Sequence, residues 1–373
     1  MKILFVHDIL ALWGGVERVI SEKLNYFARE FGYEVHVVTT NQGEHPLSFP
    51  LEKGVSHEDL HIQSHLQYRY SGLKRYWIRY CKNRLLKNRL KAKIEEINPD
   101  IVIGTTAVYM PLLIQLRGNY KLVAESHSGF DHVKEFESAT WWQKLEMNHL
   151  RTLLGKTDVL VSLTESDASK WRTVHPRVEV IPNIVHLNQT GRYSKVEEKR
   201  AVFVGRFGKQ KGIHDLLAVW AMVHQRHPDW VLDMYGEGEW LEMFKKKIDA
   251  LNANIVVHKP TSEIMDKYRE SSMLLLTSLW EPFGLVVPEA MSCGLPVVSF
   301  EADGPCSIIS DGQDGFVVKD RNVEEFANRV CQLIEDKELR QRMGRQAVSS
   351  SQRFTQEAIM PMWKNLFEKL TRK

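Results

Sequence analysis

A loop flanked by two carboxylates stands out in the second half of the sequence. It runs from Glu281 to Glu289, after an apolar run typical of a strand and into a short predicted helix. Backbone amides at a helix start lack intrahelical acceptors and bind phosphate, and a nearby carboxylate can accept hydrogen bonds from ribose hydroxyls. The pattern therefore favours a nucleotide diphosphate site, although the two carboxylates could instead only cap the helix. The backbone positions that would face the ligand are Phe283, Gly284, Leu285 and Val286.

A second polar segment, Gly205 to Gly212, also lies between a predicted strand and a predicted helix. Arg206 can bind phosphate oxygens through two parallel N–H groups, and Lys211 supplies a compact positive charge. Two cations beside a diphosphate leaving group would neutralise the charge that develops as a glycosidic bond breaks. A solvated basic turn is the simpler alternative for this segment.

Metal chemistry is not supported by the sequence. No Asp-x-Asp pair occurs, and the fifteen histidines form no zinc-type cluster. We therefore expect neither a metal nor another cofactor. Arg206, Lys211 and backbone amides would then neutralise the negative charge of the diphosphate.

Short β-branched runs alternate with helical patterns along most of the chain, which predicts parallel sheets covered on both faces by helices. Two such series predict an N-terminal Rossmann-like domain over residues 1–186 and a C-terminal one over 187–353, with a polar linker over 186–199. A last helical pattern, 354–373, is expected to pack back onto the first domain. Within the second domain, Pro288 and Gly294 predict the start and the end of one short helix. Ligands of open α/β sheets bind at the carboxyl ends of strands, so we expect the site in a cleft between the domains.

The totals agree with a two-domain protein of the cytoplasm. A chain of 373 residues with 43% hydrophobic content exceeds what one core usually organises. The net charge of +3 is nearly balanced, which argues against nucleic acid as a partner. Four widely spaced cysteines predict reduced thiols, and the first apolar run ends too early, at His7, for a signal peptide.

Several motifs together resemble glycosyltransferase family 4, the retaining enzymes with a GT-B fold of two Rossmann-like domains. The E-x7-E pair Glu281/Glu289 and the G-R-x4-K-G segment 205–212 carry most of the resemblance. Gly14-Gly15-Val16-Glu17 and Val180-Ile181-Pro182-Asn183 add to it. A dinucleotide fingerprint starting at Gly236 is excluded, because its third glycine would fall on Leu241.

The resemblance implies roles for single residues. Arg206 and Lys211 would hold the donor diphosphate, Glu289 the ribose, and Glu281 with the 283–286 backbone the sugar and phosphate. From the first domain, Gly15 would approach the donor and His127, after a predicted strand at 120–124, would lie near the anomeric centre. His258, at another strand end, would lie near the nucleotide base.

The implied reaction is transfer of a sugar from a nucleoside diphosphate donor with retention of anomeric configuration. Family frequency favours UDP, and the segment 301–305 resembles variants in some hexosyl and N-acetylhexosaminyl transferases. The acceptor would be a glycan or a lipid-linked glycan in surface polysaccharide or lipopolysaccharide synthesis. A non-catalytic scaffold of the same fold that binds a nucleotide sugar or a membrane, a phosphorylase and a sugar-nucleotide epimerase remain alternatives.

The segment 68–93 carries ten basic residues, no acidic residue and several interleaved aromatic residues. Such a basic amphipathic helix suits an anionic lipid surface or a phosphorylated acceptor, which leaves open a peripheral position at the inner face of the plasma membrane. The alternative is that its cations are merely solvated. In either case we expect its apolar stripe to pack on the N-terminal sheet. The stripe consists of Trp77, Cys81, Leu85, Leu90, Ile94 and Ile97.

Overall fold

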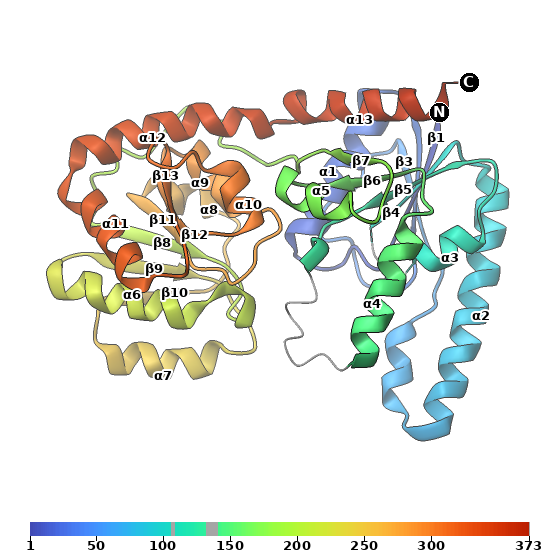
Figure 1. Cartoon of the computed structure of the whole chain (residues 1–373), viewed down its shortest axis with the longest axis horizontal. Helices are drawn as coiled ribbons and strands as arrows, with labels where there is room; N and C mark the ends of the chain where they lie inside the picture. The colour runs from blue at the N-terminus through green and yellow to red at the C-terminus, as the bar shows by residue number, and fades with distance from the viewer. Residues whose placement is uncertain (106–108, 132–140, 373) are drawn as a thin grey trace. The chain divides into compact units, whose positions relative to one another are not determined.

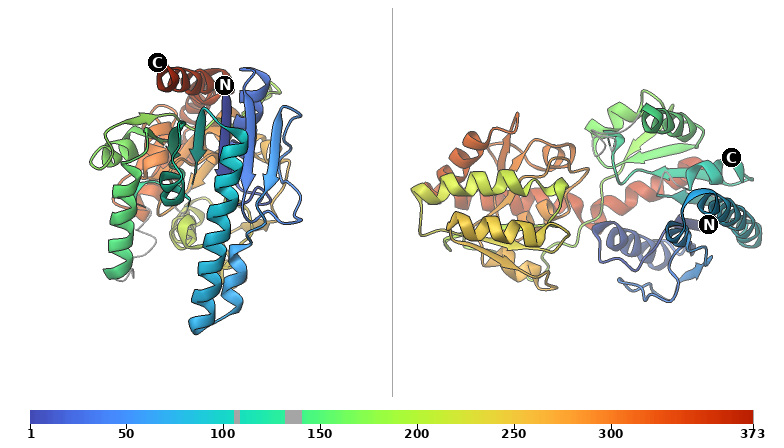
Figure 2. Two further views of the ribbon diagram at one scale, coloured as in Figure 1. Left: turned by 90° about the vertical axis from the view of Figure 1, so that its right-hand side faces the viewer. Right: turned by 90° about the horizontal axis from the view of Figure 1, so that it is seen from below.

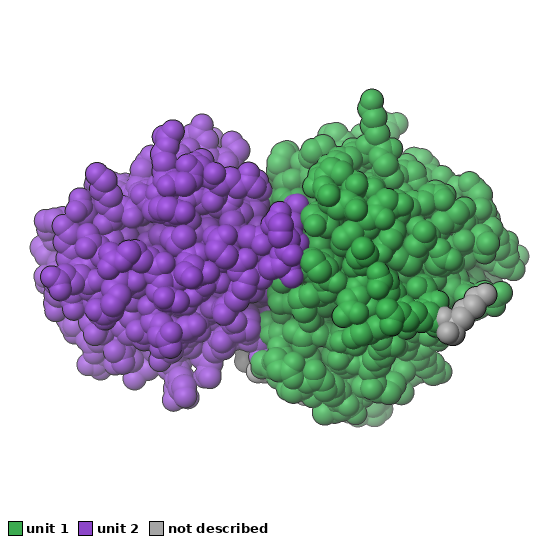
Figure 3. All heavy atoms as spheres, turned by 90° about the horizontal axis from the view of Figure 1, so that it is seen from above, with its two compact units in different colours: residues 1–184, 359–373 green, residues 185–358 purple. Residues whose placement is uncertain are grey.

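The computed structural model describes residues 1–105, 109–131 and 141–372. The chain divides into two compact units, each built on its own parallel sheet (Figures 1 and 3). Unit 1 comprises Met1–Ile184 and Ile359–Lys373, and unit 2 comprises Val185–Ala358. The prediction of two parallel-sheet α/β domains is thereby confirmed.

Unit 1 contains a seven-stranded sheet in the order β3-β2-β1-β4-β5-β6-β7, with every neighbouring pair parallel. The apolar run after Met1 forms β1, which lies in the interior of the sheet between β2 and β4. Its side chains are buried because helices cover both faces of the sheet. The strands are β1 (Lys2–His7), β2 (Glu34–Thr39), β3 (Val55–Asp59), β4 (Ile101–Gly104), β5 (Lys121–Glu125), β6 (Val159–Ser162) and β7 (Val178–Val180).

The helices of unit 1 follow the strands in the usual alternation, and α13 joins them from the far end of the chain. The helix α1 buries Val19, Ile20, Leu24 and Phe27 at helical spacing. The elements are α1 (Gly15–Arg29), η1 (Ser64–Arg69), α2 (Gly72–Ile97), α3 (Met110–Gln115), α4 (Trp141–Leu154), α5 (Glu165–Trp171) and α13 (Gln356–Thr371).

Unit 2 contains a six-stranded parallel sheet in the order β10-β9-β8-β11-β12-β13, the doubly wound order. Its strands are β8 (Arg200–Val204), β9 (Val231–Tyr235), β10 (Ile255–His258), β11 (Met273–Leu276), β12 (Val297–Phe300) and β13 (Gly315–Val318). Its helices are η3 (Lys209–Lys211), α6 (Ile213–Arg226), α7 (Leu241–Leu251), α8 (Ile264–Arg269), α9 (Val286–Ser292), α10 (Asp303–Ile308), α11 (Val323–Glu335), α12 (Lys337–Ser351) and η4 (Gln352–Phe354).

The expectation that the whole apolar stripe of α2 packs on the sheet is wrong. Only Leu90, Ile94 and Ile97 are buried, whereas Trp77 is 67% exposed and Cys81 is exposed as well. A helix of 26 residues is about 39 Å long, and a strand of four residues such as β4 spans only about 13 Å. The first half of α2 therefore extends beyond the sheet together with η1 (Figures 1 and 2). In the part of the chain that the structure describes, no helix is long and apolar enough to cross a membrane.

The polar segment 43–66, whose strands the sequence did not allow us to place, contributes the edge strand β3. One smaller prediction differs from the structure. The helix expected to begin at Pro288 begins two residues earlier at Val286, because Val287 already donates its amide to the carbonyl of Gly284. Gly294 follows the end of that helix with a φ of 88°, a conformation that favours glycine.

Aromatic packing ties α13 to the first helix of unit 1. The ring of Phe27 meets Trp363 at 6.1 Å and Phe367 at 5.2 Å between centroids, both in edge-to-face geometry. Both α13 rings are almost fully buried. Residues that are distant in sequence therefore complete the core of unit 1.

We expect Trp363→Ala to lower the free energy of unfolding by about 3–5 kcal/mol, because it leaves a large cavity in this aromatic cluster. Met362→Ala on the same helix is the matched control, since Met362 is 39% exposed and its loss should cost less than about 0.5 kcal/mol. Urea denaturation followed by circular dichroism measures both. Equal losses in the two variants would contradict the packing described.

Candidate active site

The carboxyl ends of β8 and β11 are adjacent where the strand order of unit 2 reverses. After β8 the chain moves outward to β9 and β10, then returns to the other side of β8 as β11. Doubly wound sheets bind ligands outside the strand ends at such a point. The two segments singled out from the sequence, Gly205–Gly212 and Glu281–Glu289, follow these two strands.

Hydrogen bonds join the two segments directly. The amide of Leu279 donates to the carbonyl of Gln210 at 2.7 Å, and the hydroxyl of Thr277 donates to the carbonyl of Lys211 at 3.0 Å. Gly212 has a φ of 59°, and a Cβ there would lie 2.0 Å from the carbonyl oxygen of Thr277. Only glycine permits this approach, which explains why the lysine is followed by a glycine.

Lys211 and Glu281 form a nearly buried ion pair at this junction. The Nζ atom of Lys211 lies 2.5 Å from Oε2 of Glu281, and the hydroxyl of Ser278 donates to the same oxygen at 3.1 Å. The two side chains are only 14% and 9% exposed. Arg206, five residues before Lys211, is exposed on the same loop. The structure thus brings Lys211 and Glu281 into contact and leaves Arg206 open to solvent.

Glu289 lies in the first turn of α9 and is 7% exposed, so its carboxylate is close to the start of the helix rather than on a solvated face. Gly284 precedes the helix with a φ of 87°. The amide of Gly304 donates to the carbonyl of Glu281 at 2.8 Å, and a Cβ on Gly304 would lie 2.1 Å from the carbonyl oxygen of Phe283. The loop over residues 281–286 is therefore held in place by close backbone contact with α10.

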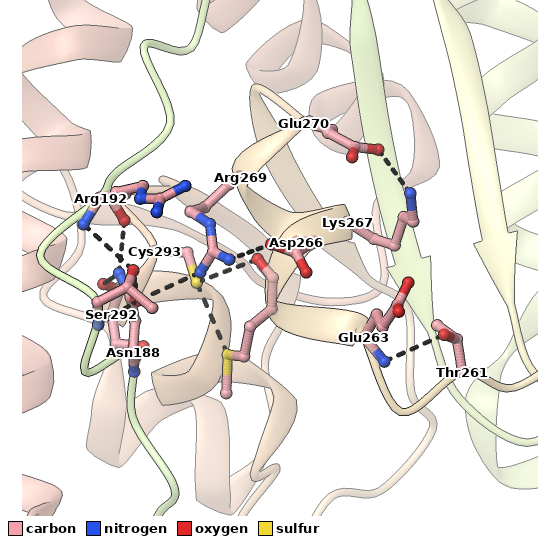
Figure 4. A network of polar contacts seen from close by, with 12 residues as sticks. Asn188, Arg192, Thr261, Glu263, Asp266, Lys267, Arg269, Glu270, Ser292 and Cys293 are labelled. Carbon is pink, nitrogen blue, oxygen red and sulfur yellow. Dashed lines mark hydrogen bonds and ion pairs between the residues drawn. The ribbon is translucent and has the colours of Figure 1, made fainter.

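A polar network fixes the far end of α9 (Figure 4). The amide of Asn188 donates to the hydroxyl of Ser292 at 3.0 Å, and Arg269 of α8 donates to the side-chain oxygen of Asn188 at 3.2 Å. The hydroxyl of Ser292 in turn donates to the carbonyl of Glu289 at 2.6 Å. Contacts remote from the loop thus keep α9, and with it Glu289, in one position.

In unit 1, His127 lies just after β5 with its side chain 6% exposed. Its Nε2 atom is 3.3 Å from Oε1 of Glu125, whose other contact is the ammonium group of the buried Lys23. Gly15 is the first residue of α1 and is exposed, while the carboxylate of Glu17 occupies the space that a Cβ on Gly14 would need. Unit 1 therefore has its own cluster of polar residues near the carboxyl ends of its strands.

The sequence matches the glycosyltransferase family 4 domain over residues 13–189 and the glycosyl transferases group 1 domain over residues 189–349. The chain belongs to glycosyltransferase family 4.

Relatives and solved structures agree with this family assignment. The amylovoran biosynthesis glycosyltransferase AmsD of Erwinia amylovora is 29% identical over 383 residues, covering 98% of this chain and 99% of the relative. An uncharacterised glycosyltransferase of Haemophilus influenzae is 27% identical over 368 residues, covering 95% and 96%.

Solved structures show that this glycosyltransferase has the GT-B fold. HepE of Anabaena, solved with UDP, has a TM-score of 0.77 at 18% identity and covers 99% of this chain and all of its own. TarM of Staphylococcus aureus, solved as a mutant with UDP and sugars, has a TM-score of 0.79 at 15% identity, covering 98% and 99%.

The side chain of His258 has protein partners in this glycosyltransferase. It lies 2.7 Å from Asp233 and stacks on Tyr235 with 4.4 Å between ring centroids. Its carbonyl accepts the amide of Gly236 at 3.1 Å. These contacts order the end of β10, and the expected contact with a nucleotide base stays a prediction.

Two residues of the unit 1 cluster escaped the sequence analysis. Lys23 lies on the apolar stripe of α1, three residues after Ile20 and four before Phe27, and a lysine at such a position is a signal of a buried charge. Glu125 ends β5 directly after the apolar run Leu122–Ala124, two residues before His127. A third polar group, in which Asp8 accepts hydrogen bonds from Tyr109 and Thr40, gave no recognisable motif.

The burial of His7 predicts a pH dependence of stability. Burial and the neighbouring His127 lower the pKa of His7 from 6.5 to about 4, so the unfolded chain binds this proton more readily than the folded chain. The associated stability is present above pH 6.5 and is lost as the pH falls towards 4. His7→Gln should reduce the loss of unfolding free energy between pH 7 and pH 5 by about 2 kcal/mol. Urea titrations at pH 7 and pH 5 measure this loss of unfolding free energy. His61→Gln is the control, because His61 is exposed and its replacement should leave the loss as in the wild type.

Proposed function

We propose that this glycosyltransferase binds a nucleoside diphosphate sugar at the β8–β11 junction of unit 2 and transfers the sugar to an acceptor bound by unit 1. The observation that carries the proposal is the junction itself, where Lys211, Glu281 and the 281–286 loop are fixed together. Lys211 and Arg206 would bind the diphosphate, and Glu289 the ribose. Glu281 would turn from Lys211 towards the sugar once the phosphates compensate the lysine.

The transfer is proposed to retain the anomeric configuration and to need no metal. Arg206, Lys211 and backbone amides would neutralise the departing diphosphate, which then helps to deprotonate the acceptor hydroxyl on the same face of the sugar. In this mechanism neither carboxylate becomes a covalent nucleophile. His127 would supply a polar contact near the anomeric centre, with Gly15 close to the donor.

The donor is proposed to be a UDP-linked hexose or N-acetylhexosamine, and the acceptor a glycan or lipid-linked glycan of a surface polysaccharide or lipopolysaccharide. Support for UDP comes from HepE and TarM, both solved with UDP. Support for the pathway comes from the name of AmsD, a glycosyltransferase of amylovoran biosynthesis, and from WaaB, a lipopolysaccharide outer core galactosyltransferase with a TM-score of 0.71.

Thermal shift with nucleotides tests the donor site. We expect one diphosphate family among UDP, GDP and ADP to raise the melting temperature in the presence of EDTA, because a ligand of the folded state stabilises it. At a concentration one hundred times the dissociation constant, the gain is about 2.7 kcal/mol. Lys211→Ala should lose this shift.

Lys209→Ala is the matched control, since it removes an exposed cation from the same short helix and should keep the shift. A shift that disappears with EDTA would contradict the metal-free site. No shift with any nucleotide would favour a non-catalytic scaffold of the same fold.

We further propose that the tip formed by η1 and the first half of α2 rests on an anionic membrane. Tyrosine and tryptophan prefer the water–lipid interface, and cations are attracted to anionic headgroups. Arg75 lies over the ring of Tyr68 and Lys74 over that of Tyr70, so the basic and aromatic groups share one surface. The apolar and aromatic side chains exposed there are Tyr68, Tyr70, Leu73, Tyr76, Trp77 and Tyr80.

Vesicle flotation tests the membrane contact. The protein should float with vesicles containing phosphatidylglycerol and remain behind with vesicles of phosphatidylcholine alone. Replacing Leu73 and Trp77 together by serine should weaken binding about tenfold or more, because two apolar side chains no longer enter the interface. Met243→Ser, on an exposed apolar residue of unit 2, should leave binding unchanged. Equal binding to both vesicle types would contradict the proposal.

A further inference from the structure

A buried ion pair lies beneath His127 in the core of unit 1. Lys23 of α1 donates a hydrogen bond to Oε1 of Glu125 at the end of β5, and each side chain is only 2% exposed. The ammonium group also lies over two aromatic rings, 5.3 Å from the centroid of Phe5 and 4.5 Å from that of Trp363. The pair is therefore enclosed by the strand β1 and the helices α1 and α13.

Stability alone is a weak explanation for this pair. Removing two charges from water costs free energy that their mutual attraction often fails to repay, and apolar residues of similar volume frequently serve a core equally well. Burial alone would raise the pKa of Glu125, but Lys23 and His127 lower it to about 2. Glu125 is therefore a permanent carboxylate in an environment that would otherwise disfavour one.

The imidazole of His127 is the neighbour that this carboxylate can act on. Its Nε2 atom is 3.3 Å from Oε1 of Glu125, yet among the described residues neither ring nitrogen has a hydrogen-bond partner of good geometry. Oε2 of Glu125 is likewise buried and unpartnered in the described part of the chain. A buried ring that has a fixed acceptor beside Nε2 and no partner at Nδ1 is suited to a ligand that arrives later, because hydrogen bonds of a binding site often tighten only when substrate binds.

We propose that Glu125 is a positioning residue that accepts the Nε2–H of His127, so that the neutral ring presents its Nδ1 lone pair to a hydroxyl of the bound sugar. Lys23 compensates the charge of Glu125, so the carboxylate stays ionised and available as an acceptor. Two further titratable groups of the described residues act on this ring, Glu17 of α1 and His7 of β1, and the Nδ1 atom of His7 is paired with the hydroxyl of Thr105 at 2.6 Å. The inference rests on the proposed function only in naming the hydroxyl as that of a sugar.

Nitrogen NMR of the ligand-free enzyme tests the tautomer directly. With ¹⁵N-labelled histidine, the His127 signals are assigned by their loss in His127→Asn. The expected result is a neutral ring protonated at Nε2 at pH 7.5. A ring protonated at Nδ1, or an equal mixture of the two tautomers, would overturn the proposal whether or not any donor is found.

Two double variants separate positioning from folding. Lys23→Met with Glu125→Leu removes both charges and the acceptor, whereas Lys23→Met with Glu125→Gln removes both charges but keeps an oxygen that can accept the Nε2–H. Both pairs avoid an uncompensated buried charge, which in a single variant such as Glu125→Leu should lower the melting temperature by about 10 °C. The Gln pair should keep the tautomer of the wild type, and the Leu pair should lose it.

Calorimetry gives the second readout, with UDP and then UDP-glucose and UDP-N-acetylglucosamine as probes. The Leu pair should bind UDP within twofold of the wild type and the preferred UDP-sugar about threefold to tenfold more weakly, the range of one lost hydrogen bond. The Gln pair should recover most of that loss.

Identical tautomers and identical sugar affinities in the two pairs would overturn the proposal and leave Lys23–Glu125 as a purely structural pair. If no nucleotide sugar binds the wild type, the proposed donor fails, and the NMR result still decides the positioning role.

Discussion

The candidate donor site depends on the close approach of two backbone segments at the carboxyl ends of β8 and β11. Parallel strands bring all their carboxyl ends to one edge of a sheet, and the reversal of strand order between β8 and β11 sends the two connecting helices to opposite faces. The loops after β8 and β11 can therefore occupy the space between these helices. Because Gly212 has no side chain, its backbone can lie directly against the carbonyl of Thr277. Once these loops are joined, Lys211 and Glu281 meet although seventy residues separate them.

Both units place a lysine–glutamate pair near the carboxyl ends of their strands, and the two pairs differ in what can reach them. Lys211 and Glu281 retain 14% and 9% exposure at the start of a loop, so the proposed diphosphate would be able to reach the lysine and replace the glutamate as its partner. Lys23 and Glu125 are each only 2% exposed, and two aromatic rings lie against the ammonium group, so an anion from solvent has no exposed cation to bind there. The first pair can therefore exchange one partner for a ligand, whereas the second pair stays intact in the folded protein. The two pairs consist of the same residue types, so their different exposure, and not their chemistry, indicates their different roles.

Much of the fold could be predicted from the sequence, because strand and helix periodicities were strong where elements pack on both faces. The strands predicted before Gly205 and before Glu281 are β8 and β11, and the helix predicted after Gly212 is α6. The extension of the first half of α2 beyond the sheet could not be predicted. The spacing of apolar residues shows which side of a helix is apolar, but not how far the sheet that it covers extends. Trp77 and Ile94 follow the same spacing, and only Ile94 has a strand to cover. The bounds of β3 were equally hidden, because an edge strand with alternating polar residues resembles a loop.

The candidate site shows the same limit at the level of single residues. Arg206, Lys211, Glu281 and Glu289 belong to two local motifs, and the order of the strands brings the two segments that carry them together, with Lys211 and Glu281 in contact. Lys23 and Glu125 belong to different elements, 102 residues apart, and neither stands in a motif. Their relation to His127 arises from the register of β5 against its neighbours and from the rotation of α1 on the sheet, which only the folded chain specifies. A residue that acts through another one is recognised only in the folded chain. Here the signs are a ring nitrogen of His127 without a partner among the described residues, and a neighbouring carboxylate whose charge a lysine compensates.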